Sequence, residues 1–194
     1  VLFSDCHRGV GNNNDNFLKN QHIYFAALRY YYTNGFTYIE LGDGDELWEN
    51  RSFAAISEIH SNVFWQLSLF EKEHRLHMLY GNHDHVLKNC RHIPHREGLV
   101  LKLCPPAESL ADCTTKPCCL ELYLTHGHQA DLLNSTLWRL SRFLVRYLWK
   151  PLEQMGVLDP TSAAKNYSRR HKSERRLSRW AVRRGCYLVT GHTH

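Results

Sequence analysis

The sequence of 194 residues has no run of about twenty apolar residues, so we expect no helix long enough to span a membrane. Internal repeats and low-complexity tracts are also lacking, which argues against a repetitive or compositionally biased architecture. Since 43% of the residues are hydrophobic and 12% are aromatic, the composition excludes a disordered chain. The formal net charge of +5 is a mild excess that fits an anionic substrate. A chain of this length forms one domain with a full core.

Paired Cys-x2-Cys knuckles are lacking too, although the chain has seven cysteines. Four of them fall in one stretch, Cys104, Cys113, Cys118 and Cys119, and an odd total does not form a regular disulfide framework. We therefore expect reduced thiols, as in a cytosolic protein. A small structural zinc site in residues 104–119 is the alternative, but the spacing there is not that of typical zinc knuckles.

An initiator methionine is absent as well. Val1-Leu2-Phe3 resembles the middle of a strand, and the sequence stops at His194, directly after a Gly-His-Thr-His motif. We therefore interpret residues 1–194 as a single domain excerpted from a longer chain, and the absence of a signal peptide carries little weight.

Short apolar runs alternate with longer amphipathic stretches, which predicts the α/β class. The predicted strands span residues 1–4, 36–41, 75–80, 99–103, 120–125 and 187–190. We expect one helix from about Phe17 to Thr33, and a second that begins after Ser52 and reaches about Glu73. A mostly helical insertion, at about residues 131–185, separates the last two strands.

A polar cluster directly follows five of the predicted strands. The clusters are Asp5-Cys6-His7, Gly42-Asp43, Gly81-Asn82-His83-Asp84, His126-Gly127-His128 and Gly191-His192-Thr193-His194. Because open α/β sheets bind ligands at the carboxyl ends of their strands, we expect the five clusters to converge on one place. The glycines within them allow the tight turns that direct a side chain from a strand end toward a metal.

The candidate ligands in these clusters are carboxylates, imidazoles and one carboxamide. Such a mixed set of nitrogen and oxygen ligands suits Mn, Fe or Zn better than a metal that prefers thiolates. Seven ligands are too many for one ion, but they suit two ions that share a bridging carboxylate. Two ions about 3.5–4 Å apart clamp the attacking and leaving oxygens of a phosphoryl displacement and lower the pKa of a bound water.

Taken together, the five blocks resemble the signature of the calcineurin-like metallophosphoesterases. The matching residues are Ser4-Asp5-x-His7-x-Gly9, Gly42-Asp43, Gly81-Asn82-His83-Asp84, His126-Gly127-His128 and Gly191-His192-Thr193-His194. They occur in the family's order and span the chain from end to end. The resemblance implies central β-sheets flanked by helices, with a helical insertion before the last motif. It also implies a dinuclear metal-dependent hydrolase of phosphate mono- or diesters or pyrophosphates, in which a metal-bound hydroxide attacks.

The same resemblance implies a role for each site residue. One metal would be held by Asp5, His7 and His194, the other by Asn82, His126 and His192, and both would be bridged by Asp43. His83 would face the substrate phosphate and protonate the leaving group as general acid, and Asp84 would orient and charge-stabilise His83. The two divalent ions would be Mn, with Fe or Zn as the alternatives.

Some assignments within the blocks stay open. A shift of register would put Asp45 in the place of Asp43, and His128 competes with His126 as a ligand. Glu46, three residues after Asp43, is expected to support the ligands without contacting the metal. Arg8 and His128 are the candidates for contact with the substrate, although a solvated Arg8 is an equal alternative.

The insertion carries two concentrations of basic residues. Residues 137–149 are apolar and aromatic apart from a basic stripe that continues past their end, formed by Arg139, Arg142, Arg146 and Lys150. Nine further basic residues lie between residues 165 and 184. One interpretation is a helix packed on the core with a solvated charged face. The other is a lid with an apolar wall for a lipid or a base, or a surface helix that contacts anionic lipid.

The expected partner is a phosphorylated substrate of unknown identity. The basic insertion also suits peripheral contact with a membrane, so we expect a cytoplasmic location with membrane-peripheral attachment as an alternative. Nucleic acid, bound through backbone phosphates, is a less favoured partner.

A narrower resemblance concerns the UDP-diacylglucosamine pyrophosphohydrolases, which carry a basic helical insertion in the same place. The segment Ser162-Ala163-Ala164-Lys165-Asn166 is similar to theirs. They commonly have arginine where this chain has His83, and of the two only histidine readily releases a proton near pH 7. The competing functions are a UDP-sugar-lipid pyrophosphohydrolase with a lipid-binding lid, and a non-catalytic binding module of the same fold. The complete set of ligands argues against the binding module.

Overall fold

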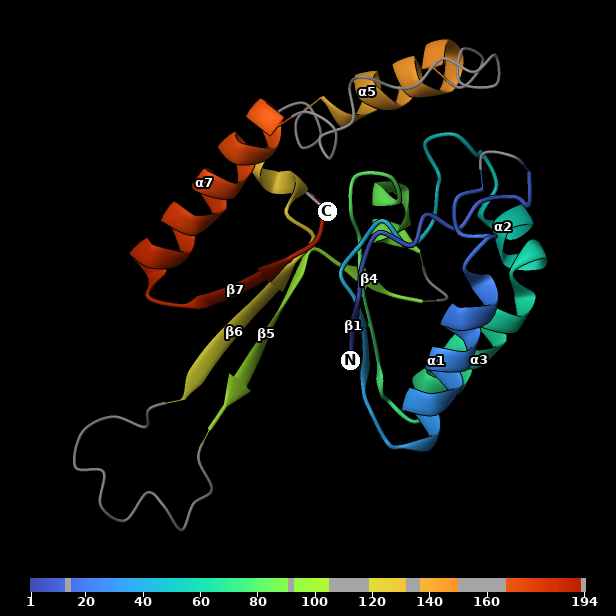
Figure 1. The fold of residues 1–194 in the computed structure, drawn as a ribbon, viewed down its shortest axis with the longest axis horizontal. Helices are drawn as coiled ribbons and strands as arrows, with labels where there is room; N and C mark the ends of the chain where they lie inside the picture. Colours follow the sequence, from blue (N-terminus) through green and yellow to red (C-terminus); the bar gives the residue numbers. More distant parts are fainter. Residues whose placement is uncertain (13–14, 91–92, 105–118, 132–136, 150–166, 193–194) are drawn as a thin grey trace.

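A computed structural model describes residues 1–12, 15–90, 93–104, 119–131, 137–149 and 167–192. These residues form two β-sheets with helices packed against them (Figure 1). The first sheet has the order β1 (Leu2–Phe3), β2 (Tyr38–Glu40), β3 (Leu76–Leu79) and β4 (His95–Arg96), and all its strands are parallel. The α/β class predicted from the sequence is therefore confirmed.

The second sheet contains β5 (Gly98–Leu103), β6 (Leu120–Thr125) and β7 (Tyr187–Thr190). β5 is antiparallel to β6, and β6 is parallel to β7. Because residues along a strand alternate between the two faces of a sheet, Leu122 and Leu124 of β6 lie on one face and Tyr123 and Thr125 on the other. The face with Leu122 and Leu124 packs against Ile39 of the first sheet and its neighbours.

The opposite face of the first sheet is covered by α1 (Gln21–Thr33) and α3 (Ser61–Lys72), as Figure 1 shows. This second part of the core is large and aromatic, and its buried members include Tyr24, Leu28, Leu67 and Phe70. The first sheet is thus buried on both faces, and its central strand β2 is buried at every residue. Such burial explains why β2 and β3 carry apolar residues on both faces, with Glu40 and His77 as the exceptions, instead of a strict alternation.

The helix expected between Ser52 and Glu73 is divided in two. Ser52 caps α2 (Phe53–Ile59), where its side chain accepts from the N–H of Ala55, and α3 begins after His60. His60 is completely buried, with Nε2 2.9 Å from Asp15 Oδ2. The side chain of His60 is therefore an anchor for the loop before α1, which a sequence pattern alone does not show.

The last two helices belong to the predicted insertion. α7 (Tyr167–Arg184) lies along the second sheet (Figure 1). Trp180 of this helix contacts Tyr123 of β6 edge to face. α5 (Trp138–Leu144) continues into a short π-helical segment, η4 (Val145–Trp149). No helix among the described residues combines the length and apolar character needed to cross a membrane.

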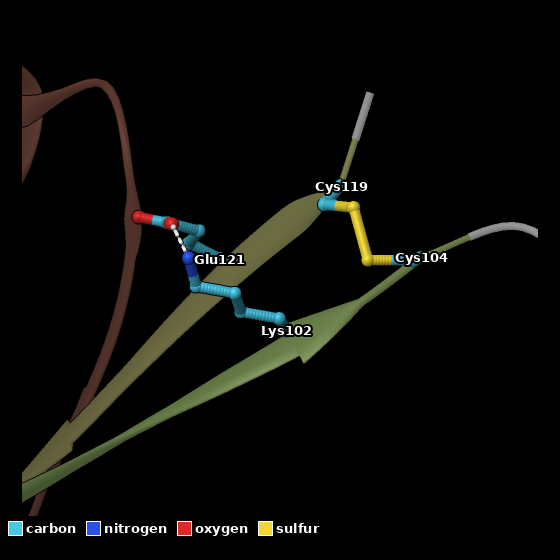
Figure 2. Close-up of a disulfide and its surroundings, with 4 residues drawn as sticks. All are labelled: Lys102, Cys104, Cys119 and Glu121. Atoms are coloured by element: carbon cyan, nitrogen blue, oxygen red, sulfur yellow. Dashed lines mark ion pairs between the residues drawn. A yellow bond between two sulfur atoms is a disulfide. The ribbon is translucent and has the colours of Figure 1, made fainter. Parts of the chain in front are cut away.

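Two of the four cysteines in residues 104–119 form a disulfide, Cys104–Cys119 (Figure 2). The expectation that these residues are reduced thiols or zinc ligands is therefore wrong. The physical reason is the register of β5 and β6, in which Leu103 is opposite Leu120. Their next neighbours outward are consequently face to face, with Cα atoms 4.3 Å apart. Cys113 and Cys118 lie outside the described residues.

Candidate metal centre

The loops after β1 and β2 run side by side and carry three of the predicted ligands. The backbone N–H of Asp5 donates to the carbonyl of Gly42 (3.1 Å), and that of His7 donates to the carbonyl of Asp43 (2.9 Å). These bonds continue the parallel pairing of the two strands beyond their ends. Asp5, His7 and Asp43 are therefore held on adjacent backbones at the carboxyl edge of the sheet.

Backbone strain is concentrated at the predicted ligands. Five non-glycine residues of the described chain have a positive φ angle, and four of them are predicted ligands: Asp5 (55°), His7 (49°), Asp43 (51°) and His192 (69°). A side chain in this region of conformational space costs of order 1–3 kcal/mol, and such residues cluster at functional sites. The strain therefore marks this edge of the molecule as a site.

Close approach of the backbones requires glycine at two positions. A Cβ atom on Gly81 would collide with Oδ1 of Asp43, and one on Gly191 would collide with Oγ of Ser4. The clusters that contain Gly81 and Gly191 can therefore approach the loops after β1 and β2 only because these two residues lack a side chain.

Three groups of potential ligand atoms occur among the described residues. His7, Glu46 and His83 form one, and the other two, the ligand groups, share Asp43. One group consists of Asp43, His126 and His192, and the other of Asp5, His7 and Asp43. Within each group the atoms lie within 4.8 Å of one another, so that each group could hold a metal ion. Five of the seven predicted ligands are thus brought together, and Asp43 belongs to both groups.

The environment of His126 fits a metal ligand in particular. This side chain is completely buried, and its Nδ1 lies 3.1 Å from the carbonyl oxygen of Leu41. A carbonyl oxygen only accepts, so Nδ1 carries a proton and Nε2 of the neutral ring has a lone pair. That lone pair faces Asp43 Oδ2 at 3.1 Å. Two acceptors so close require a proton or a cation between them, and a backbone carbonyl behind the ring is typical of metal-bound histidine.

Asn82 supplies a buried oxygen atom that lacks a partner. Only 2% of the residue is exposed, and its Oδ1 has no hydrogen-bond partner within the described part of the chain. A buried acceptor that is left unsatisfied costs about 1–3 kcal/mol. Coordination of a cation by Oδ1 would remove this cost.

The site shifts the pKa values of its candidate ligands in different directions. Burial alone would raise the pKa of Asp43, but His126 and His83 outweigh it and hold that pKa well below its usual range. Burial, with a smaller contribution from His126, lowers the pKa of His192 to about 4. At neutral pH Asp43 is therefore ionised and His192 neutral, the states in which they can bind a metal. Burial opposes protonation of His7 and His126, but Glu46 at His7 and Asp43 at His126 outweigh it and raise the pKa of both rings.

The predicted general acid, His83, lies beside this centre. Its backbone N–H donates to Asp43 Oδ1 (2.8 Å), and its ring stacks on Trp48 with centroids 4.3 Å apart. Nδ1 is 2.8 Å from Glu46 Oε1 and 2.7 Å from Oε2. Burial opposes protonation of the ring, but Glu46 and Asp43 outweigh it and raise the pKa of His83 to about 10.

The partner predicted for His83, Asp84, makes different hydrogen bonds. Its Oδ2 accepts from the N–H of Gly44 (2.8 Å), and its Oδ1 accepts from the N–H of Gly81 (2.6 Å). Asp84 thus joins two of the glycine turns, while Glu46 makes the contact that orients the His83 ring. The negative charge of Asp84 still contributes to the raised pKa of His83.

Arg8 does not face the site, in contrast to its expected contact with substrate. The side chain is completely buried, with Nε 2.8 Å from Asp45 Oδ1 and Nη2 3.0 Å from Glu40 Oε1. Its sequence position next to His7 is misleading because the loop directs alternate side chains to opposite sides. The pairing also occupies Asp45, so the alternative in which Asp45 replaces Asp43 finds no support.

The predicted residue His128 is outside both ligand groups. His128 is buried, and its ring centroid is 5.5 Å from that of His126. Burial, followed by the nearby His126, lowers the pKa of His128 to about 3. His126 is therefore the histidine of this block that joins a ligand group. His194 lies outside the described residues, and its assignment stays a prediction.

The basic helix of the insertion is attached to the loop that contains Glu46 and Trp48. Arg146 donates from Nε to the carbonyl of Trp48 (2.9 Å) and from Nη2 to that of Leu47 (2.8 Å). Leu140 and Phe143, by contrast, are 54% and 57% exposed. Trp138 packs against the ring of His85 and Arg139 is exposed, as expected for a helix packed on the core with a solvated charged face. Arg146, however, faces the protein, and most apolar side chains of the helix face outward, so this interpretation holds only in part. Lys150 lies outside the described residues.

The sequence analysis did not identify Trp48 as part of the site. It expected Glu46 to support the ligands, as its contact with His7 does, but it did not expect the contact of Glu46 with His83. The spacing of three residues from Asp43 to Glu46 was the available signal for the carboxylate. No comparable signal exists for Trp48, because an aromatic residue after a strand is more often part of the core. Searches of protein-family models, curated proteins and solved structures gave no match to the chain.

Proposed function

We propose that the protein is a metal-dependent phosphoesterase with two divalent ions, which hydrolyses phosphate esters or pyrophosphates. The observation that carries this proposal is the shared position of Asp43 between the group with Asp5 and His7 and the group with His126 and His192. A carboxylate shared between two candidate ion sites is the arrangement that dinuclear hydrolases use. Mn is the ion that we favour, with Fe or Zn as alternatives, because the donors are nitrogen and oxygen atoms.

The residues present fit two ions. Asp5 and His7 would hold one ion and His126, His192 and the Asn82 oxygen the other, with Asp43 between them. When bound, the ions would polarise the phosphoryl oxygens and lower the pKa of a coordinated water. His194, which follows His192 by two residues, is proposed to complete the set.

The chain itself would supply the proton for the leaving group. His83 is next to Asn82 in sequence, its N–H is bonded to Asp43, and its ring is about one-fifth exposed, with a side-chain accessibility of 22%. Glu46 holds Nδ1, which leaves Nε2 as the nitrogen that can give a proton to a leaving oxygen. Trp48, stacked on the ring, limits its rotation.

A second candidate is hydrolysis of a pyrophosphate in a lipid-linked substrate. The exposed apolar side chains of α5 and η4 favour it, because Leu140, Phe143 and Leu148 are each more than half exposed. Arg146 attaches the same helix to the loop with Trp48, which would place an apolar surface beside the reacting groups. The two candidates share the metal centre and differ only in the substrate.

The test is to compare the chain with its Asp43→Asn variant for metal content and for Mn-dependent hydrolysis of bis(p-nitrophenyl) phosphate and p-nitrophenyl phosphate. We expect about two ions per chain in the natural sequence, with loss of one or both ions and of turnover in the variant. His83→Ala is the matched comparison, since it should retain the metal and slow turnover by about 10²–10⁴-fold. Full activity of Asp43→Asn would overturn the shared role of Asp43. Faster hydrolysis of a lipid pyrophosphate than of either aryl phosphate would select the second candidate.

A further inference from the structure

A cavity of about 490 Å³ lies between α7 and the second sheet, on the face that is turned away from the first sheet. Its wall is mainly apolar and includes Val100, Tyr123, Leu177, Trp180 and Leu188. The volume falls in the range of small-molecule sites, roughly 300–1,000 Å³. Because so apolar a wall offers water few hydrogen bonds, an apolar ligand would be favoured over solvent.

One end of the cavity is polar. Gln129 and Arg176 belong to its wall there. Gln129 Oε1 accepts from the N–H of Gly127 (3.1 Å), which fixes the orientation of the amide. The other amide atom, Nε2, is buried and has no hydrogen-bond partner among the described residues. Arg176 is exposed beside it and donates from Nη1 to the carbonyl of Ala130 (2.7 Å). Both groups are donors, so this end suits an acceptor and especially an anion.

The charge around the cavity also favours an anionic ligand. α7 contains eight arginine and lysine residues and a single acid, Glu174, which pairs with Arg170. The Arg184 guanidinium, which is not part of the wall, lies 5.4 Å from the centre of a ring of the wall residue Trp180. Glu97 is the single carboxylate of the wall, and it is hydrogen-bonded to Tyr80, which is not a wall residue. An anionic group is therefore favoured over a cationic one.

We propose that this cavity binds the alkyl chain of a single-chain anionic amphiphile, with the chain between Leu177 and Leu188 and the head group at Gln129 and Arg176. Tyr123 and Trp180 form the far wall of the chain site. None of the proposed metal ligands belongs to the wall, so the site goes beyond the proposed function and can be tested without metal.

The probe is dodecyl phosphate, titrated calorimetrically below its micelle concentration into the whole chain in the presence of EDTA. We expect one molecule per chain, with no binding of inorganic phosphate alone and weaker binding of dodecanol. Arg176→Met and Gln129→Leu should each weaken the binding of dodecyl phosphate by about ten-fold, because each removes a donor to a charged oxygen. Neither substitution should weaken the binding of dodecanol.

Val100→Trp tests the position of the chain. The new side chain would fill the cavity from β5 and should abolish binding, while Val182→Trp, on an exposed part of α7, should leave it unchanged. Leu188→Phe is the second filling variant if Val100→Trp fails to fold, as judged by circular dichroism. Equal binding to the filled and control variants would overturn the site. Dodecanol binding as tightly as dodecyl phosphate would overturn the assignment of the head group.

Discussion

The Glu46 carboxylate lies 2.7 Å from Nδ1 of His83. The same carboxylate lies 2.9 Å from Nδ1 of His7, a candidate metal ligand. One side chain therefore orients both a proposed ligand and the proposed general acid. The rings of His7 and His83 consequently stand perpendicular to each other, with centroids 4.7 Å apart.

We expect Glu46→Gln to lower metal-dependent turnover by about 10–100-fold, the usual effect of removing a carboxylate that supports a ligand. Glutamine keeps the size of the side chain but has one acceptor atom and no charge, so it cannot hold both rings as Glu46 does. The measurement is turnover with bis(p-nitrophenyl) phosphate together with metal content. Glu58→Gln, at an exposed position of α2, is the matched control and should change neither. Unchanged turnover in Glu46→Gln would contradict the supporting role.

Arg8→Met should lower the free energy of unfolding by about 3–5 kcal/mol, because it leaves the carboxylates of Glu40 and Asp45 buried without a counter-charge. Chemical denaturation in EDTA measures this effect without a contribution from metal. The control is Arg170→Met, which removes the arginine of the exposed ion pair Arg170–Glu174. It should lower the free energy of unfolding by less than about 1 kcal/mol. Similar losses in the two variants would show that the buried network is not a major contributor to stability.

Stability should fall as the pH decreases below the usual pKa of histidine, in part because of His95. This residue is buried, and burial lowers its pKa below the ordinary value of 6.5. The unfolded chain then takes up the proton more readily than the folded chain, so the stabilisation is complete above about pH 6.5 and is lost as the pH falls toward the lowered pKa. Denaturation of the natural sequence and of His95→Gln at pH 7.5 and pH 5.5 tests this. If the free energy of unfolding of His95→Gln fell between the two pH values by as much as that of the natural sequence, His95 would be excluded as a source of the pH dependence.

Reduction of the Cys104–Cys119 bond should destabilise the protein by up to about 3 kcal/mol, the entropy that a cross-link of this loop length removes from the unfolded chain. Thermal unfolding with and without dithiothreitol gives the difference. In the double variant Cys104→Ser/Cys119→Ser, dithiothreitol should have no effect on the unfolding temperature. An equal effect of dithiothreitol on both proteins would assign the change to another cysteine.

Much of the fold could be predicted from local patterns. Apolar runs identified β2, β3, β5, β6 and β7, because these strands carry the residues that bury both faces of one sheet and one face of the other. β4, with two residues, was not predicted, since so short a strand has no periodicity to detect. The break at His60 was missed for a different reason, because the partner of that histidine, Asp15, is 45 residues away in sequence.

The sequence by itself determined which residue types follow each strand and that five polar clusters lie at strand ends, while the position of Asp43 between two groups was expected only from the family resemblance. Polar residues at the carboxyl edge of a sheet converge whatever the details of packing. Only the tertiary structure decided the partners, including Glu46 for His83, the burial of Arg8, the Cys104–Cys119 bond and the outward apolar side chains of α5. These depend on the register of strands and the direction of side chains across distant segments, and neither is encoded in a local pattern.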